Sequence, residues 1–294
     1  MRIHVFASGS GGNCLLLEDR ETRILIDAGI SKRRVVTTLA GLGLRMEQIG
    51  GVLITHEHSD HISGLESLVK GRTIPVCAPH TVAARLLGAK PSLQEHLQVI
   101  PVGEPFSLGS LRITAFHTSH DTDESVGYRI EGEGVYAHAT DTGCVTEGMR
   151  AGLLGADTVL LESNHDEDML RYGPYPFYLK KRILSDRGHL SNAACAAFAR
   201  ELAESGTRRI ILGHLSRENN TPQKALETSR AAEDVGPCGG DGERVADGDS
   251  TPSDSRLAGD RRPPHPRPPG GEARALCGFA RAWCEGLFAV PGAS

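Results

Sequence analysis

The feature that most constrains this chain is a dense cluster of polar residues that directly follows a short apolar run. The run at 51–55 reads GVLIT and predicts a buried strand, and residues 56–61 then read HEHSDH. A strand held in a sheet positions the loop at its end rigidly, so alternate side chains there can converge on a small volume. Because imidazole nitrogens and carboxylate oxygens suit divalent metals, the cluster predicts a metal centre at a sheet edge.

The same cluster predicts more than one metal. Its potential ligands are His56, His58, Asp60 and His61. Four side chains from one short loop cannot all bind one ion in a good geometry, so we expect two adjacent metals that draw further ligands from other loops. The further candidates share a position at the end of a predicted strand, and they are His120, Asp141 and His214.

Two other histidines compete for these positions. His117 and His138 each lie three residues before a preferred candidate, His120 and Asp141 respectively, and both fall within predicted strands. A position inside a strand favours a core histidine, or one that supports a ligand by a hydrogen bond, over a metal ligand.

Three more polar residues lie at strand ends. Asp27 ends the segment ILID, and Glu162 and His165 lie at the end of the strand predicted over 158–163. A carboxylate that accepts a hydrogen bond from a ligand fixes the orientation of that ligand. We therefore predict that Asp27, Glu162 and His165 support the metal ligands without touching the metals. For Asp27 the alternative is a turn or helix-cap carboxylate.

Apolar runs and amphipathic segments alternate along residues 1–232. Strands are predicted at 2–7, 13–18, 23–28, 52–55, 97–101, 111–117, 125–131, 135–140, 158–163 and 209–212. Helices are predicted at 31–42, with Ser31 as N-cap, and at 62–69, 81–87, 145–154, 178–185, 192–204 and 222–232. Strands that form hairpins first and then alternate with helices predict an α/β (α+β) fold of two mixed sheets packed together, with helices outside.

The composition changes abruptly after Ala232. Residues 233–294 contain no Ile, Lys, Asn, Gln, Tyr or Met and are rich in Gly, Pro, Asp and Arg. Such a composition cannot build a packed core and predicts a disordered tail, apart from one short amphipathic helix over 273–290. A natural flexible tail and a shifted reading frame both explain it, and the composition favours the second. We therefore expect one folded domain at 1–232.

Overall composition limits the function classes. The formal net charge of -5 disfavours attraction to nucleic acid across the whole surface but leaves room for a local basic groove. No run of 18 apolar residues occurs, and the N-terminal residues lack a basic stretch followed by an apolar one, so we expect neither a membrane span nor a secretory signal. The 7 cysteines have no tight spacing, which favours free thiols in the cytoplasm.

Short stretches around the candidate ligands carry a specific resemblance. They are SGSGGNC at 8–14, TSHD at 118–121, ATDTG at 139–143, LESNHD at 161–166, GPYP at 173–176, LSDRGHLSN at 184–192 and GHLSRENNTP at 213–222. With Asp27 and the 56–61 cluster, they resemble the metallo-β-lactamase-fold hydrolases. Within that fold they look like the YycJ/WalJ subfamily, which is similar to the ribonuclease Z and ribonuclease J groups. The resemblance spans about residues 1–230 and implies a four-layer αββα sandwich.

The resemblance also implies how two divalent metals, Zn(II) or Mn(II), would be shared. One metal would be held by His56, His58 and His120. The other would be held by Asp60, His61 and His214. Asp141 would bridge both. Members of the fold that open β-lactam rings generally lack a bridging aspartate and often place a cysteine there, so Asp141 favours phosphodiester or thioester cleavage.

The activity implied by the resemblance is a 5′-to-3′ DNA exonuclease linked to mismatch repair, with a nucleic acid as partner and no membrane. The closing strand and helix of the subfamily are not recognisable in residues 233–294. Two alternatives stay open. One is a small phosphodiester or thioester hydrolase on the same metal site, and the other is an inactive metal-binding protein with a damaged C-terminus.

Four residues are predicted to act on the substrate. Asp60 would orient the attacking hydroxide, and His189 would bind the phosphate or protonate the leaving oxygen. Ser191 and Asn192 open the helix predicted at 192–204, where backbone N–H groups can hold a phosphate; alternatively, Ser191 only caps that helix. Basic and aromatic residues interleave over 171–187, a pattern that suits a single strand of nucleic acid or a plain amphipathic helix.

Overall fold

The computed structural model describes residues 1–234 and 287–289. The strands are β1 (Arg2–Ala7), β2 (Cys14–Asp19), β3 (Thr22–Ile26), β4 (Gly51–Leu53), β5 (Val76–Ala78), β6 (Leu97–Val99), β7 (Pro105–Leu108), β8 (Leu111–His117), β9 (Val126–Glu131), β10 (Val135–Ala139), β11 (Thr158–Glu162), β12 (Arg209–Gly213) and β13 (Leu287–Ala289). The helices are α1 (Lys32–Gly41), α2 (Ser59–Ile62), α3 (Leu65–Val69), α4 (His80–Ala89), α5 (Glu147–Leu153), α6 (Glu167–Tyr172), α7 (Phe177–Ile183), α8 (Asn192–Glu204) and α9 (Pro222–Asp234), with short 3-10 turns η1 (Met46–Gln48) and η2 (Pro91–Leu93).

The strands form two mixed sheets. The first sheet runs β1-β2-β3-β4-β5-β6, antiparallel as far as β3 and parallel beyond it. The second runs β13-β12-β11-β10-β9-β8-β7, antiparallel from β7 to β10 and parallel beyond it. The carboxyl ends of parallel strands meet at one edge of a sheet, so the loops that follow β4, β10, β11 and β12 can come together.

Side-chain alternation along the strands explains why the two sheets pack face to face. In β2, Leu15 and Leu17 point into the core between the sheets, whereas Leu16 points to the helices on the outer face. In β3, Ile24 and Ile26 join the inner core and Leu25 the outer one. The period of two in a strand therefore gives apolar residues to both faces, as a sheet buried on both sides requires.

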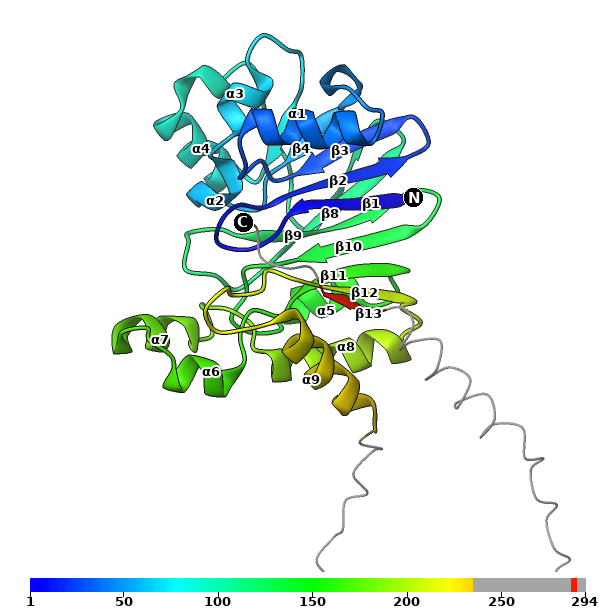
Figure 1. The fold of residues 1–294 in the computed structure, drawn as a ribbon. Coiled ribbons are helices and arrows are strands. Elements are labelled where there is room, and N and C mark those ends of the chain that lie inside the picture. The colour runs from blue at the N-terminus through cyan, green and yellow to red at the C-terminus, as the bar shows by residue number, and fades with distance from the viewer. Residues whose placement is uncertain (235–286, 290–294) are drawn as a thin grey trace, which may run out of the picture.

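Helices cover the outer face of each sheet. Figure 1 shows α1, α3 and α4 along the first sheet and α5, α8 and α9 along the second. Ser31 caps α1 as predicted, because its Oγ accepts a hydrogen bond from the backbone N–H of Arg34. The order helix, sheet, sheet, helix confirms the predicted αββα sandwich.

Two predictions about the C-terminal residues meet the structure only in part. Most of 233–294, for which we predicted disorder and one helix, lies outside the described residues. Inside the described part, Leu287–Ala289 pair in parallel with β12 as β13, so the helix predicted over 273–290 is wrong for these three residues. The edge of β12 offers unpaired backbone groups, which an apolar segment such as LFA can satisfy.

None of the helices in 1–234 combines the length and the apolar character that a bilayer crossing requires.

Candidate metal centre

The seven candidate ligands, which come from distant parts of the chain, lie around one small volume. Four groups of side chains have potential ligand atoms within 4.8 Å of one another. Three consist of the candidate ligands alone: His56, His58 and His120; His56, His61 and Asp141; and Asp60, His61 and His214. The fourth joins Asp141 and His214 to Glu162 and His189. The candidate ligands come from the loop after β4 and helix α2, from the loop between β8 and β9, and from the residues after β10 and β12. The structure therefore brings together every residue that the sequence proposed as a metal ligand.

Asp141 lies between two of these groups, the one that contains His120 and the one that contains His61 and His214. Its Oδ1 is 3.6 Å from His120 Nε2 and 3.5 Å from His214 Nε2, and its Oδ2 is 3.3 Å from His61 Nε2. Asp141 Oδ2 and His214 Nε2 are buried and make no hydrogen bond within the described residues. A buried carboxylate oxygen and a buried imidazole nitrogen without partners are costly, and divalent cations would satisfy both. The donor set therefore fits a pair of metal ions.

Asp27 holds one of these histidines from behind. Its Oδ2 accepts from His61 Nδ1 at 2.8 Å, and its Oδ1 accepts from the backbone N–H of Thr55 at 2.9 Å. With Nδ1 occupied in this way, His61 presents Nε2 to the centre. Burial alone would lower the pKa of His61, but the carboxylates of Asp27 and Asp141 raise it well above its usual value.

Glu162 orients two histidine rings by accepting hydrogen bonds from their Nδ1 atoms. Its Oε1 accepts from His189 Nδ1 at 2.7 Å and from His214 Nδ1 at 2.9 Å, so both rings turn Nε2 away from the carboxylate. Burial would raise the pKa of Glu162, but the two imidazoles hold it below its usual value. The other oxygen accepts from the backbone N–H of Thr142 at 2.8 Å, which ties Glu162 to the loop of Asp141. One buried carboxylate thus orients both rings.

Backbone strain is concentrated at this centre. Asp27, Asp141 and His214 have φ angles of 59°, 56° and 55°, in the left-handed region that non-glycine residues rarely adopt. Arg20, with a φ of 51°, is the other non-glycine residue of this kind among the described residues. Such strain persists only where the surrounding structure enforces it, and it is typical of functional sites.

The remaining predicted residues differ in their placement. Ser191 Oγ accepts from the backbone N–H of Ala194 and thus caps α8, and it also donates to Glu167. Asn192 is buried, with its amide bonded to Ser163 and Asn220, and it does not line the hollow around the histidines. The Asn192 side chain therefore packs within the fold. Ser191 has the geometry of a helix cap, which is the alternative to a phosphate site.

Three histidines outside the ligand groups also have clear positions. The ring of His165 is buried and makes no hydrogen bond with the described residues. His117 is exposed at the end of β8, so a core position is wrong for it. His138 is buried in β10, as a core histidine is expected to be, with its Nδ1 3.2 Å from the hydroxyl of Tyr136. Neither His117 nor His138 occurs in a group of potential ligands.

His138 gives a testable pH dependence. Burial lowers its pKa to about 4, below the value of about 6.5 for an exposed histidine. Since the folded chain disfavours the protonated ring, the contribution of His138 to the free energy of unfolding should be constant above pH 6.5. It should fall by about 3 kcal/mol as pH drops from 6.5 to 4. Urea unfolding in EDTA at pH 7.5 and 4.5 measures this loss, and His138→Gln should show a loss smaller by about that amount. An equal loss in both proteins would contradict the assignment.

Two contacts at the centre were not foreseen. Asp121 Oδ1 is 3.2 Å from His120 Nε2 and 3.9 Å from His58 Nε2, and the other oxygen pairs with Arg182 of α7. The Asn13 amide nitrogen is 2.9 Å from His61 Nε2. The only signal for Asp121 was its place next to His120, and for Asn13 its place in the glycine-rich turn at 8–14.

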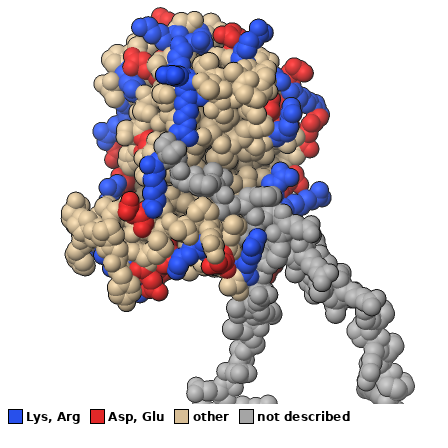
Figure 2. All heavy atoms as spheres, viewed as in Figure 1, with Lys and Arg blue, Asp and Glu red and all other residues tan. Residues whose placement is uncertain are grey.

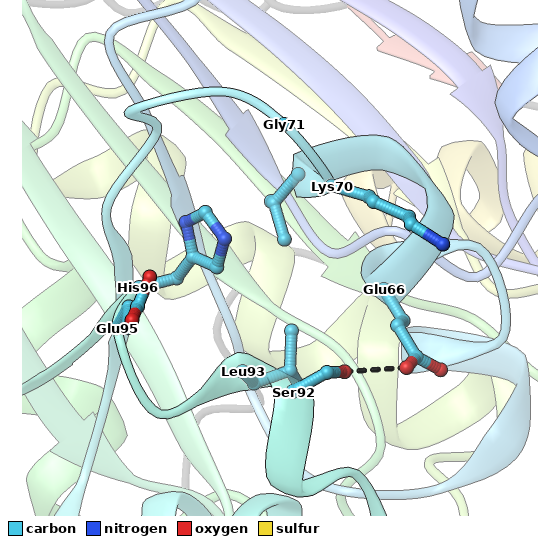
Figure 3. A pocket seen from close by; sticks show the side chains of 8 residues that line it. Glu66, Lys70, Gly71, Ser92, Leu93, Glu95 and His96 are labelled. Carbon is cyan, nitrogen blue, oxygen red and sulfur yellow. Dashed lines mark hydrogen bonds between the residues drawn. The ribbon is translucent and has the colours of Figure 1, made fainter.

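An open hollow of about 280 Å³ leads to the centre. Exposed Ser10 and Ser59 lie on its rim, His189 and Asp141 line its floor, and α7 forms one wall. A second hollow of about 240 Å³ lies between α3 and η2. Figure 3 shows its mixed charges, with Ser92 bonded to Glu66, and it has no cluster of potential metal ligands. The first hollow is therefore the candidate active site.

Comparisons with known proteins agree with this geometry. A family model described as "Beta-lactamase superfamily domain" matches residues 22–215. Exodeoxyribonuclease YycJ of Bacillus anthracis is 36% identical over 241 residues, which cover 80% of this chain and 90% of the relative. Exodeoxyribonuclease WalJ of Streptococcus pneumoniae is 37% identical over 230 residues, which cover 76% and 85%.

The fold has a counterpart among solved structures. The metallo-beta-lactamase fold protein YhfI from Bacillus subtilis superposes with a TM-score of 0.61 at 19% identity, over 78% of this chain and 92% of that one. At this identity the match speaks for the fold alone, whereas the family model and the two sequence relatives speak for common descent. The chain belongs to the metallo-β-lactamase-fold, metal-dependent hydrolases, in the subfamily of YycJ and WalJ.

Proposed function

We propose that this protein is a two-metal phosphodiesterase that degrades DNA from the 5′ end, within residues 1–232, and serves DNA repair. The observation that carries the proposal is the position of the Asp141 carboxylate, within 3.6 Å of imidazole nitrogens from both histidine groups. A carboxylate shared between two cation sites suits phosphoryl chemistry, in which charge builds on several oxygens at once. The names of the relatives, exodeoxyribonucleases YycJ and WalJ, support DNA as the substrate.

The proposed ligands divide into two sets that share Asp141. The first set is His56, His58 and His120. The second set is Asp60, His61 and His214. Mixed imidazole and carboxylate donors suit Zn(II), and a site with carboxylates that transfers phosphoryl groups also accepts Mn(II). When bound, two such ions lower the pKa of a water and offset negative charge on the phosphate oxygens.

Side chains of this protein supply the remaining functions. Asp60 is half-buried beside His61 Nε2, at 3.6 Å, where its carboxylate can accept a proton from the attacking water and orient it. His189 has its Nδ1 bonded to Glu162, and its Nε2 makes no hydrogen bond with the described residues. The ring lines the hollow, so Nε2 can donate to a phosphate oxygen or to the leaving oxygen.

The shape of the hollow supports a nuclease. A nuclease needs an open approach, whereas a hydrolase of small esters needs a closed pocket, and this hollow has an exposed rim.

The cysteines bear on the compartment in which the protein would act. The described free thiols are Cys14, Cys77, Cys144 and Cys195. Free thiols support a reducing compartment such as the cytoplasm.

His189→Ala should separate catalysis from metal binding. Because His189 contacts Glu162 and the hollow but belongs to neither proposed ligand set, we expect the rate to fall about 100-fold with unchanged metal content. Steady-state kinetics and elemental analysis of the same preparation measure both quantities. Loss of a metal together with the rate would instead make His189 a ligand.

A labelled oligonucleotide tests the proposed function. The full chain, loaded with Zn(II) or Mn(II), is incubated with single-stranded DNA that carries a 5′ label, and the products are resolved by length. Early release of labelled mononucleotide supports the proposal. Turnover of only bis(p-nitrophenyl) phosphate or a thioester would indicate the small-ester alternative, and two bound metals without any turnover would indicate an inactive metal-binding protein.

A further inference from the structure

Two short helices project from the sandwich beside the candidate active site. They are α6 and α7, joined by the segment 173–176, and Figure 1 shows them extending from the side of the second sheet. We call residues 167–184 the aromatic arm. Neither proposed ligand set includes a residue of the arm.

The arm carries an unusual set of exposed rings. Tyr172, Phe177 and Tyr178 are 86%, 81% and 74% exposed, and the other strongly exposed large apolar residues of the described part are aliphatic. Figure 2 shows mainly uncharged atoms on the outer part of this projection. Isolated exposed apolar residues are ordinary, but three rings within seven positions of one projection form a patch that calls for a partner.

The inner side of the arm belongs to the active-site hollow. Tyr175, Leu179 and Arg182 line the hollow together with His120, Asp141 and His189. The guanidinium of Arg182 pairs with Asp121, which adjoins His120, so α7 is tied to a ligand loop. The exposed rings therefore belong to the same short segment that lines the place where a phosphodiester would be cleaved.

The charge of the arm complements a phosphate backbone. Helix α7 reads FYLKKRI, with three cations and no acid, in a chain whose net charge is -5. Lys180 donates to the carbonyl of Arg171 at 2.8 Å, and Arg182 is bonded to Asp121, whereas exposed Lys181 makes no hydrogen bond or ion pair with the described residues. One cation beside two rings is thus available to a ligand.

We propose that the aromatic arm binds the single-stranded DNA that leads into the hollow, with bases stacked on Phe177 and Tyr178 and a phosphate near Lys181. The inference rests on the proposed function, since it names the surface that holds the rest of the substrate. Stacking on exposed rings together with nearby cations is the usual way in which proteins bind a single strand without reading its sequence.

The test compares long and short substrates. In the Phe177→Ala/Tyr178→Ala double variant, kcat/KM for a decanucleotide should fall about 10- to 100-fold, because each stacked base contributes several-fold to binding. Activity on bis(p-nitrophenyl) phosphate should stay within about twofold, because this small substrate fits in the hollow, whose lining includes neither Phe177 nor Tyr178. Fluorescence anisotropy with a labelled decanucleotide in EDTA, which prevents cleavage, should show a matching rise in Kd.

Matched variants make the result specific. The exchange Phe177→Tyr/Tyr178→Phe keeps both rings and should behave as the wild type. Val99→Ala removes two methyl groups from a residue that is 62% exposed on β6, outside the arm, and should change neither activity. Lys181→Ala should weaken decanucleotide binding. The slope of log K for binding against log salt concentration should become less steep by about one, as expected for the loss of one phosphate contact.

Three outcomes would overturn the inference. One is equal binding of the decanucleotide by the wild type and the double variant. Another is a parallel loss of activity on both substrates, which would mean that the arm shapes the metal centre itself. The third is a dimer that the double variant converts to a monomer, which would assign the rings to contact between two copies. If the wild type binds DNA through the arm but does not cleave it, the proposed function fails and this inference stands.

Discussion

Asp141→Ala is expected to abolish hydrolysis and to empty at least one of the two proposed metal positions. The Asp141 carboxylate lies within 3.6 Å of His61, His120 and His214, and no other described carboxylate adjoins all three rings so closely. Loss of a shared ligand removes more charge stabilisation than loss of one hydrogen-bond donor, so the rate should fall at least about 1000-fold. Elemental analysis after dialysis and initial rates on a labelled oligonucleotide measure both effects.

A second carboxylate provides the control for this variant. Asp123 is exposed and pairs with Arg85 at the surface, so Asp123→Ala should keep the metal content and the rate. If Asp141→Ala also kept two metals per chain and its full rate, Asp141 would have no part in holding the metals, and the bridging assignment would be wrong.

Gly29→Ala is expected to be the most damaging conservative substitution near the centre. A Cβ atom at Gly29 would lie 1.6 Å from the backbone oxygen of Asp60 and 2.8 Å from the backbone nitrogen of Asn13. These neighbours are backbone atoms, and Asp60 O also accepts from the Asn13 N–H at 2.7 Å, so the ligand loop would have to move. We expect a loss of about 3 kcal/mol in the free energy of unfolding and weaker metal binding.

Gly41→Ala is the matched control. Gly41 ends helix α1, and a Cβ atom there meets nothing within 4 Å. Alanine favours the helix over glycine, so this variant should be as stable as the wild type or more stable by about 0.5–1 kcal/mol. Urea unfolding of both variants in EDTA separates the effect on the fold from the effect on the metals. Equal stability of the two variants would mean that the contact of Gly29 with the ligand loop is unimportant.

The chain's local patterns were enough to predict most of the fold. Alternating apolar residues predicted strands such as β8 at its observed bounds, and helix α8 was predicted at its observed bounds as well. The strands β5 and β7 and the helix α6 were not predicted. They have three, four and six residues, too few for a period to show, and they form because neighbouring strands and loops complete their contacts.

The candidate ligands could be predicted because each stands where an apolar strand ends. That position depends only on local sequence, and parallel strands then bring their carboxyl ends together. The contacts between loops could not be predicted in this way. Asp121 with Arg182, and Asn13 with His61, join residues that are far apart in sequence, and only the packing of the two sheets and the arm decides which of them meet.

Ser191 and Asn192 are a second case in which local sequence leaves two roles open. Their place at a helix start is compatible with both a phosphate site and a structural cap. The side chain of Asn192 is held by Asn220 in a loop 28 residues away, and local sequence does not reveal such a contact.

The central claim is that side chains from separate loops hold two metals around Asp141. Crystals of the full chain grown with Mn(II) or Zn(II), and recorded at the absorption edge of that metal, test it most directly. The account predicts two anomalous peaks, one among His56, His58 and His120 and one among Asp60, His61 and His214, with Asp141 between them. A single peak, or none at these side chains, would contradict it.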